Sequence, residues 1–251
     1  MSEAATLPTR KDEAWRYARA DALAALDPAR LARWQDITLE PGETRRKCLV
    51  LDDEHAGIHR VRLTVGEGAR AEIFSAVTGG DYTRLEVEVT LARGAHFEFG
   101  GVTLGGRDTV REFVTTTVHA EPEATSNQVV RAVQWGQGTG NFLGRIDVAR
   151  DAQKTNAAQD FKGLLLEKGA SVNAVPQLEI FADDVKCAHG ATVGQLDEAA
   201  RYYMASRGLS PEQSRRLLVR AFIGDAFVAL DDADESERLM DIAIAKLDRH
   251  L

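Results

Sequence analysis

The sequence has very few cysteines, and this scarcity limits the redox and metal chemistry available to one copy of the chain. Among 251 residues, the only cysteines are Cys48 and Cys187. They could form at most one disulfide, and in a reducing compartment two free thiols are the expected state. A complete iron–sulfur site uses about four thiolate or imidazole ligands, and neither cysteine belongs to a C-x-x-C pair. A metal held by this chain is therefore expected to need ligands from a second chain.

Long apolar segments and dense basic stretches are also missing. No apolar run approaches the ~20 residues of a membrane span, and the N-terminus MSEAATLPTRKDE lacks the hydrophobic segment of a secretory signal. The formal net charge of -8 argues against nonspecific binding to nucleic acid, which depends on Lys and Arg. We expect a cytoplasmic protein with no membrane and no nucleic-acid partner.

A phosphate-binding loop for nucleotides is missing as well. The stretch WGQGTGNFLG is rich in glycine, but no Gly-Lys-Ser or Gly-Lys-Thr follows it. Its flanks have the pattern of strands, so no helix N-terminus is available to bind phosphate. We expect these glycines at bends of a sheet, and we expect ATP hydrolysis to be supplied by a partner.

Residues 1–45 are predicted to form an N-terminal helical segment. Thr9 precedes Asp12 by three residues, which is a capping arrangement. Apolar residues then follow at helical spacing, at Trp15, Ala18, Ala22 and Leu26. The pattern predicts one helix that ends near Asp27 and packs through Trp15.

Residues 46–192 are predicted to form the core. This segment consists of short runs rich in Val, Ile, Leu, Thr and Phe, without helical periodicity. In RLEVEVTLA, Leu85, Val87 and Val89 alternate with Glu86 and Glu88, as expected for a strand with an apolar inner face and a polar outer face. An aromatic content of only 6% suits a narrow interior filled by aliphatic side chains.

A weak internal repeat runs through this core. Five segments align, each with a turn-prone or charged residue before an alanine: GARAE from Gly68, GAHFE from Gly94, EATSN from Glu123, DAQKT from Asp151 and GASVN from Gly169. Their uneven spacing is compatible with stacked coils joined by variable turns. The pattern favours a right-handed parallel β-helix, and an antiparallel sandwich is the alternative.

Residues 193–251 are predicted to form a C-terminal helical subdomain of three helices. The first ends at Gly208, and the second begins at Ser210, where Gln213 completes a capping box. The apolar stripe of the second helix is assigned to Leu217, Leu218, Ala221, Phe222 and Val228, and that of the third to Leu239, Ile242, Ala243 and Leu247. These helices are expected to cap the end of the β-helix or to dock a partner.

The segment FADDVKCAHGATVGQLDE contains a motif with metal-ligand character. Cys187 and His189 are two positions apart in a stretch with the pattern of extended chain, so their side chains are expected on one face. A soft thiolate and an imidazole about 6.5 to 7 Å apart form half of a metal site. By residue type alone, a single Cys and a single His on a strand are more often packed or solvated than ligands.

Two stretches of the sequence resemble a known family. VKCAHGATVGQLDE, with the aromatic pair in ARYYMASRGLS, resembles the C-terminal signature of SufD-type members of the SufB/SufD family, and PTRKDEAWRY resembles their N-terminal signature. The resemblance implies a parallel β-helix and decides the fold prediction. It also implies a non-enzymatic scaffold for iron–sulfur cluster assembly that pairs with a SufB-like subunit and a SufC-like ATPase. A homodimer is the expected assembly when the SufB-like subunit is absent.

The same resemblance assigns roles to individual residues. His189 occupies the position at which SufD-like proteins face a cysteine of SufB, so it is expected to help hold a transient iron–sulfur cluster shared between the subunits. Cys187 is expected to be a supporting thiol. The helices after Gly194 are expected to bind the ATPase, with Phe222 and Phe227 as contributors, although core packing is the expected role of at least one of these two.

An enzyme built on a β-solenoid is the alternative function. It would be carbohydrate-active or acyl-transferring, with His189 as general base. Such an enzyme needs a cleft with convergent carboxylates or exposed aromatics, or, for an acyltransferase, regular six-residue repeats, and the sequence shows neither. Asp183 and Asp184 are adjacent, which in a strand places them on opposite faces.

Overall fold

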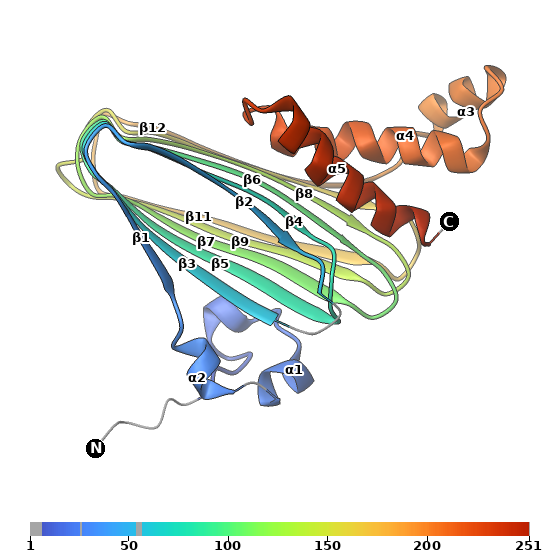
Figure 1. Ribbon diagram of the computed structural model, residues 1–251, viewed down its shortest axis with the longest axis horizontal. Helices are drawn as coiled ribbons and strands as arrows, with labels where there is room; N and C mark the ends of the chain where they lie inside the picture. The colour runs from blue at the N-terminus through green and yellow to red at the C-terminus, as the bar shows by residue number, and fades with distance from the viewer. Residues whose placement is uncertain (1–6, 26, 54–56, 251) are drawn as a thin grey trace.

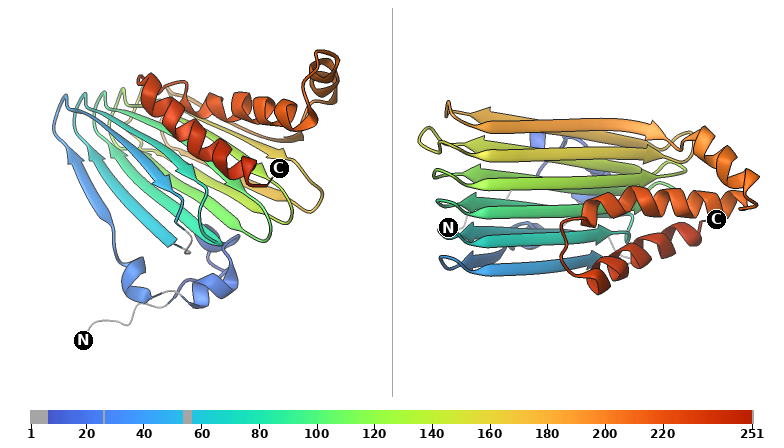
Figure 2. Two further views of the ribbon diagram at one scale, coloured as in Figure 1. Left: turned by 45° about the vertical axis from the view of Figure 1, so that its right-hand side comes forward. Right: turned by 90° about the horizontal axis from the view of Figure 1, so that it is seen from above.

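The computed structural model describes residues 7–25, 27–53 and 57–250. Two six-stranded sheets form its centre, and helices pack on the outer face of each sheet (Figures 1 and 2). The strands are β1 (Gln35–Leu39), β2 (Thr44–Leu51), β3 (Gly57–Val65), β4 (Arg70–Val77), β5 (Tyr82–Leu91), β6 (His96–Gly105), β7 (Val110–His119), β8 (Thr125–Gln134), β9 (Thr139–Val148), β10 (Asn156–Leu165), β11 (Ser171–Ile180) and β12 (Lys186–Gln195). They extend beyond the range 46–192, because β1 precedes it and β12 continues past it.

Every strand pairing described in the two sheets is parallel. Sheet A has the order β1-β3-β5-β7-β9-β11, and sheet B has the order β12-β10-β8-β6-β4-β2. The chain therefore alternates between the sheets with each strand, and each circuit adds one strand to both. This is the topology of a solenoid whose coils contact only their neighbours. The predicted β-helix is confirmed, and the antiparallel sandwich is excluded.

The turns that enter sheet B explain most of the sequence repeat. Gly68, Gly94 and Glu123 have φ values of 63°, 62° and 67°, and the alanine after each of them is buried. Glycine adopts this left-handed conformation without a steric penalty, and the small alanine fits inside the turn. The first three segments of the repeat are therefore equivalent, as predicted.

The other two segments of the predicted repeat are not equivalent to these. In the strand register, Lys154 with a φ of 61° takes the place of Glu123, three residues after the predicted start at Asp151. Gly169 precedes β11 and belongs to the turns that enter sheet A. The predicted alignment was wrong at Asp151 because the turn before β10 is longer than the turns before β6 and β8. It places a lysine in the left-handed conformation, in which lysine is uncommon, so the sequence did not indicate this position.

The interior between the sheets is filled by side chains that alternate with outward-facing residues. On β5, Leu85, Val87 and Val89 are at most 2% exposed, as predicted. Five of the nine phenylalanines of the chain also lie in this interior: Phe97, Phe99, Phe113, Phe142 and Phe161. The expectation of a purely aliphatic interior was therefore wrong, since the few aromatic residues are concentrated where burial stabilises the fold most.

The N-terminal segment is not the single helix that was predicted. It contains the 3-10 helix η1 (Glu13–Trp15) and the short helices α1 (Ala20–Ala24) and α2 (Pro28–Leu31). The Thr9 N–H donates to the Asp12 carboxylate at 2.7 Å, but Asp12 is the N-cap of a helix of only three residues and its side chain makes no capping hydrogen bond to it. Tertiary packing breaks the helical pattern, because Trp15 is 8% exposed and its ring lies 3.8 Å from the Arg84 guanidinium on sheet A.

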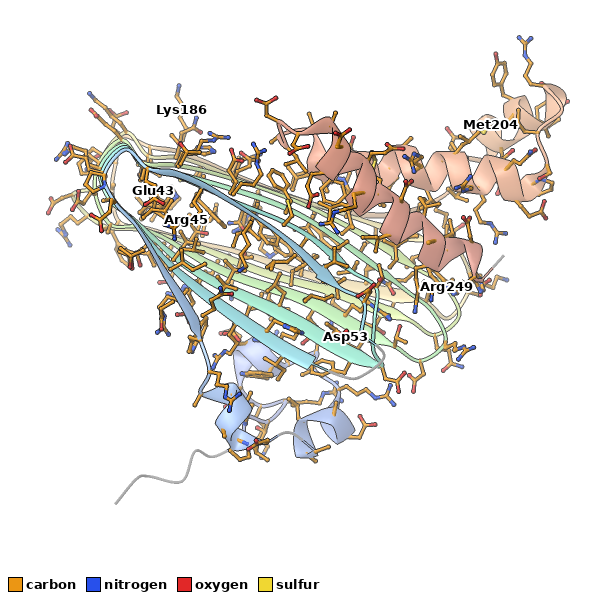
Figure 3. The ribbon with its side chains drawn as sticks, viewed as in Figure 1. Glu43, Arg45, Asp53, Lys186, Met204 and Arg249 are labelled. Carbon is orange, nitrogen blue, oxygen red and sulfur yellow. The ribbon has the colours of Figure 1, made fainter. Side chains whose placement is uncertain are left out.

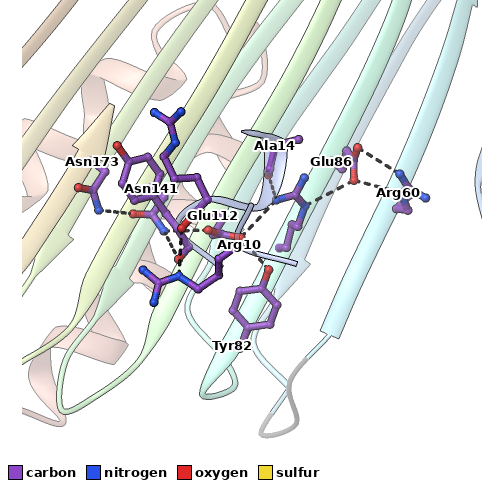
Figure 4. Close-up of polar contacts among 11 residues, drawn as sticks. Arg10, Ala14, Arg60, Tyr82, Glu86, Glu112, Asn141 and Asn173 are labelled. Atoms are coloured by element: carbon purple, nitrogen blue, oxygen red, sulfur yellow. Dashed lines mark hydrogen bonds and ion pairs between the residues drawn. The ribbon is translucent and has the colours of Figure 1, made fainter. Parts of the chain in front are cut away.

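A buried polar network lies beneath this segment (Figure 4). Arg84 lies 3.4 Å from the Glu112 carboxylate and donates to the Ala14 carbonyl oxygen at 2.7 Å. Glu112 also accepts hydrogen bonds from the Tyr82 hydroxyl at 2.7 Å and from the Asn141 amide at 2.8 Å. Because the buried charges are paired and hydrogen-bonded, the network holds the N-terminal segment against the outer face of sheet A.

The C-terminal helices α3 (Glu198–Ser206), α4 (Pro211–Gly224) and α5 (Ala233–Asp248), with the 3-10 helix η2 (Asp225–Phe227), follow β12. The Gln213 N–H donates to Ser210 Oγ at 3.2 Å, so the predicted capping box is confirmed. Helices α4 and α5 cover the outer face of sheet B and do not cap the end of the solenoid (Figures 1 and 2). None of the described helices has both the length and the apolar character needed to cross a membrane.

The buried stripe of α4 differs from the predicted one. Val219 and Ile223 are buried against sheet B, whereas Leu217 is 47% exposed. Val228, which was assigned to the same stripe, lies beyond the end of α4 and is 82% exposed. Apolar residues occupy more than one face of this helix, so periodicity alone did not identify the face that the sheet covers. For α5 the predicted face is largely confirmed, since Leu239, Ala243 and Leu247 are buried while Ile242 is half-buried.

Candidate functional site

The last strand of each sheet forms an open end of the solenoid. β11 pairs with β9 and β12 pairs with β10, so each has a second backbone edge that no described strand covers. Ile180, Phe181 and Val193, at or just after these strands, are 39%, 63% and 54% exposed. An uncovered strand edge beside exposed apolar side chains can bind another strand.

Strand β12 carries both residues of the C-x-H motif. Cys187 lies beside Ala157 and His189 lies beside Gln159 in the register with β10. Since Ala157 and Gln159 are buried inside the solenoid, Cys187 and His189 share the inward face of sheet B. Cys187 is half-buried against a small apolar cluster, whereas His189 is exposed. The fold therefore places the motif at the open end, where a second chain can reach His189.

The protonation of Cys187 limits what this site can do alone. Burial raises the pKa of the Cys187 thiol, and a hydrogen bond with the Ala157 backbone opposes this shift. A thiol with a raised pKa is mostly protonated near neutral pH and is a weak ligand until a metal displaces the proton. Among the described residues, no three His, Cys, Asp or Glu side chains are grouped to hold a metal ion. Cys187 and His189 can therefore supply only part of the ligand set of a cluster.

A row of polar side chains leads inward from His189, and the sequence did not reveal it. The strand register places Gln128, Gln159 and His189 side by side on β8, β10 and β12. Gln128 accepts a hydrogen bond from the Thr115 hydroxyl at 2.6 Å, whereas the Gln159 amide is buried and has no partner among the described residues. To predict this row from the sequence, one would have to know the register of the three strands, and the register depends on the lengths of the turns between them.

The two phenylalanines expected at an ATPase contact differ in burial. Phe227 is 2% exposed and packs edge-on against Phe74, with ring centroids 6.5 Å apart. Phe222 is half-buried, with the Arg131 guanidinium 6.0 Å from its ring centroid. Phe227 is thus part of the core between the helices and sheet B, and of the two only Phe222 is accessible at the surface.

Helix α3 presents two neighbouring aromatic side chains at the surface. It contains no buried residue and projects away from the solenoid (Figures 1 and 2). Tyr202 and Tyr203 are 80% and 59% exposed. Adjacent helical residues point about 100° apart, so two neighbouring tyrosines were a signal that at least one faces outward. An exposed aromatic pair on a helix without packing is a candidate docking surface.

Comparison with known proteins points in the same direction as the motifs. A family model described as SUF system FeS cluster assembly, SufBD core domain, matches residues 42–222. The iron-sulfur cluster assembly protein SufD of Escherichia coli K12 is 31% identical over 179 residues, which are 71% of this chain and 42% of that protein. A SufBD family protein of Synechocystis is 32% identical over 161 residues, 64% of this chain and 36% of that protein.

A plant relative shows a shorter and closer match. The chloroplastic protein ABCI7 of Arabidopsis thaliana is 42% identical over 102 residues, 40% of this chain and 22% of that protein. The chain thus spans less than half the length of each of these relatives. The region matched by the family model runs from before β2 into α4 and includes Cys187 and His189. The chain therefore belongs to the SufBD core family of the SUF iron–sulfur cluster assembly system.

Proposed function

We propose that this chain is a non-enzymatic scaffold subunit for iron–sulfur cluster assembly. It pairs through the open end formed by β11 and β12 with a second, SufB-like chain of the same family, and the nascent cluster is assembled between the two. The observation that carries the proposal is the position of His189 on a strand with one uncovered edge. The names of the relatives, which describe iron–sulfur cluster assembly proteins, support the same role.

The hydrogen-bonding pattern of β12 supports pairing by strand addition. The Lys186 N–H donates to the Thr155 carbonyl oxygen of the neighbouring coil at 2.8 Å. In a parallel ladder, alternate residues bond to the same neighbour, so the N–H groups of Cys187, His189 and Ala191 face the free edge. A partner strand that binds these groups would be held next to the imidazole. In the absence of a SufB-like chain, the same edge is expected to pair with a second copy.

The cluster is cargo in this proposal, and His189 contributes one ligand to it. A neutral imidazole donates through one ring nitrogen, and thiolates of the partner chain would complete the coordination. Cys187 supports the site from its half-buried position, and its thiol becomes a ligand only if an iron ion displaces the proton.

The energy for assembly comes from a SufC-like ATPase bound to the C-terminal helices. Tyr202 and Tyr203 on α3, Leu217 and Phe222 on α4 give this region an apolar surface that sheet B does not cover. A nine-residue helix without buried residues is marginal in water, so α3 would gain stability from a partner.

Complementation in cells that depend on this pathway tests the proposed function. The chromosomal copy is replaced by His189→Ala, and the activity of an iron–sulfur enzyme is measured beside the melting temperature of the purified variant. We expect loss of cluster assembly with a stability change within about 0.5 kcal/mol, because His189 is a surface residue.

The matched control is Asp183→Ala, an exposed residue of the loop between β11 and β12. It should preserve both assembly and melting temperature. Full complementation by His189→Ala would exclude the ligand role, and a large drop in its melting temperature would show that the imidazole is needed for folding.

A further inference from the structure

A cavity of about 500 Å³ lies between the solenoid and the end of α5. Its walls come from the turns that follow β4 and β6, with Asp81 and Arg107, and from the last residues of the chain described, with Lys246 and Arg249. Figure 3 shows Arg249 at the point where the end of α5 approaches these turns. The cavity is on a different part of the molecule from His189.

The wall of this cavity is unusually basic for an acidic protein. Arg107, Lys246 and Arg249 line it, and Asp81 is the one carboxylate among the described lining residues. None of the three cations forms an ion pair with a described carboxylate, although Arg216 and Arg220 on α4 do, with Asp248, Glu237 and Asp241 of α5. Three positive charges and one negative charge leave about two positive charges without a counterion in a chain of net charge -8.

A fourth cation lies directly behind the wall. Arg111 is fully buried and donates to the Thr109 hydroxyl and, at 3.0 Å, to the Gly80 carbonyl oxygen, and both of these residues line the cavity. Burial lowers the pKa of Lys246, and Arg111, Arg249 and Arg107 lower it further. Of these four cations, Arg111 is fully buried and Lys246 is half-buried, whereas Arg107 and Arg249 are exposed. Buried cations that repel one another are costly unless an anion binds between them.

Stacking and hydrogen bonds connect the remaining wall to the solenoid. The His250 ring stacks on Trp135 with centroids 4.9 Å apart, and His250 Nε2 lies 2.8 Å from the Glu167 carboxylate. Glu167 in turn accepts a hydrogen bond from the Gly136 N–H at 2.8 Å. These contacts hold the end of α5 against the turn after β8, which places the basic side chains around the cavity.

We propose that this cavity binds a phosphate-bearing small molecule. Its volume lies within the roughly 300–1,000 Å³ range of small-molecule sites, and its excess of two positive charges matches a doubly charged phosphate group. Arginine presents a planar set of donors that suits phosphate oxygens, and lysine adds a point charge. The site is independent of the cluster-assembly role proposed for His189.

Ligand binding should tie α5 to the solenoid, because the basic residues come from both. The test uses the full chain with any tag at the N-terminus, so that the end of α5 is unaltered. Calorimetry and thermal melts are carried out with pyrophosphate, ADP and adenosine, at constant ionic strength set with sodium chloride. We expect saturable binding of pyrophosphate and ADP, a raised melting temperature with both, and no binding of adenosine.

The relative affinities for pyrophosphate and ADP show whether the bound phosphate group belongs to a nucleotide or to a free phosphate compound. Tighter binding of ADP indicates a nucleotide, and equal or tighter binding of pyrophosphate indicates a free phosphate compound. Absence of saturable binding by both, or a shift in melting temperature that sodium chloride alone reproduces, overturns the proposal.

Charge-neutralising variants locate the site. Lys246→Gln and Arg249→Gln are each expected to weaken pyrophosphate binding about tenfold, the effect of losing one charge-assisted hydrogen bond. Arg150→Gln removes one positive charge from an exposed turn. This turn follows the C-terminal end of β9, whereas the cavity lies near the N-terminal end of that strand, so the affinity should be unchanged. If Arg150→Gln weakens binding as much as Lys246→Gln does, the binding reflects overall charge and the proposed site is wrong.

Discussion

His189 on β12 lies directly beside Gln159 on β10, and the two residues differ completely in exposure. His189 is exposed at the open end of the solenoid, whereas Gln159 is 2% exposed one coil further in. Gln128, one coil beyond Gln159, completes a row of polar residues inside a mostly apolar interior. Burial of an amide is costly unless its donors and acceptors are satisfied. The two buried glutamines are therefore expected to contribute differently to the free energy of unfolding.

The two glutamines provide a matched pair of substitutions. Gln128→Leu should lower the free energy of unfolding by about 1–3 kcal/mol, because the Thr115 and Thr117 hydroxyls lose the amide that they contact at 2.6 and 3.3 Å. Gln159→Leu should be neutral or stabilising, because its amide has no described partner to lose. Urea unfolding of both variants measures the difference. Equal destabilisation by the two would show that Gln159 is hydrogen-bonded in solution.

A buried histidine should make the stability depend on pH. His119 is fully buried, its Nε2 lies 2.9 Å from Ser126 Oγ, and burial lowers its pKa to about 4. In the unfolded chain its pKa is about 6.5, so between about pH 6.5 and pH 4 the unfolded state binds more protons. The contribution of His119 is therefore present above pH 6.5 and is lost as the pH falls, by up to about 3 kcal/mol.

The free energy of unfolding is measured by urea unfolding at neutral pH and at about pH 5. His119→Gln keeps a polar group near Ser126 but does not titrate, so its stability should fall less between the two pH values than that of the unchanged protein. Identical losses in the two proteins would mean that His119 does not stay neutral in the folded state.

Local patterns in the sequence predicted the strands and turns, and the family resemblance decided between the β-helix and the antiparallel sandwich. Alternation in RLEVEVTLA and the glycines before Ala69 and Ala95 reflect strand faces and turn conformations, which depend on near neighbours. The faces of α4 were predicted less well, because Leu217 and Val219 are both apolar and only the position of sheet B decides which is buried. The position of Trp15 is likewise determined by its contact with Arg84 on sheet A, which the helical spacing of the N-terminal segment does not predict.

The candidate site was predictable only in part for the same reason. Cys187 and His189 lie two residues apart, so their shared face follows from strand geometry. Their position at an uncovered edge depends on the order of the strands, which the sequence contains only through the family resemblance. The row that ends at His189 joins residues about thirty positions apart and requires the register of β8, β10 and β12.

Pairing through the free edge of β12 can be tested with proline. Ala191→Pro removes an N–H group that faces away from β10, and an edge strand tolerates proline at such a position. We expect the variant to fold and to lose association with a co-expressed SufB-like chain, measured by copurification. Ala188→Pro is the comparison, because its N–H faces β10 and its loss should lower the melting temperature. Undiminished copurification of Ala191→Pro would argue against strand addition.

Docking of the ATPase can be tested on α3 without disturbing the solenoid. Tyr202→Ser and Tyr203→Ser, combined, remove two exposed rings from a helix that buries none of its residues. Because both rings are mostly exposed and, among the described residues, Tyr203 contacts only the Arg207 guanidinium at 5.1 Å from its ring centroid, the melting temperature should stay nearly constant. The affinity for a SufC-like ATPase should fall at least about tenfold, since exposed aromatic residues are frequent anchors of interfaces.

The control for the tyrosine variant is Val193→Ser, which removes an exposed apolar side chain at the other proposed interface. It should leave ATPase binding unchanged, as measured by calorimetry.

The two phenylalanines should behave differently from each other. Phe222→Ala should weaken ATPase binding less than the double tyrosine variant, because its ring is half-buried beside Arg131. Phe227→Ala should lower the stability of the chain, because Phe227 packs on Phe74. ATPase binding that survives loss of both tyrosines would place the docking surface elsewhere on the chain.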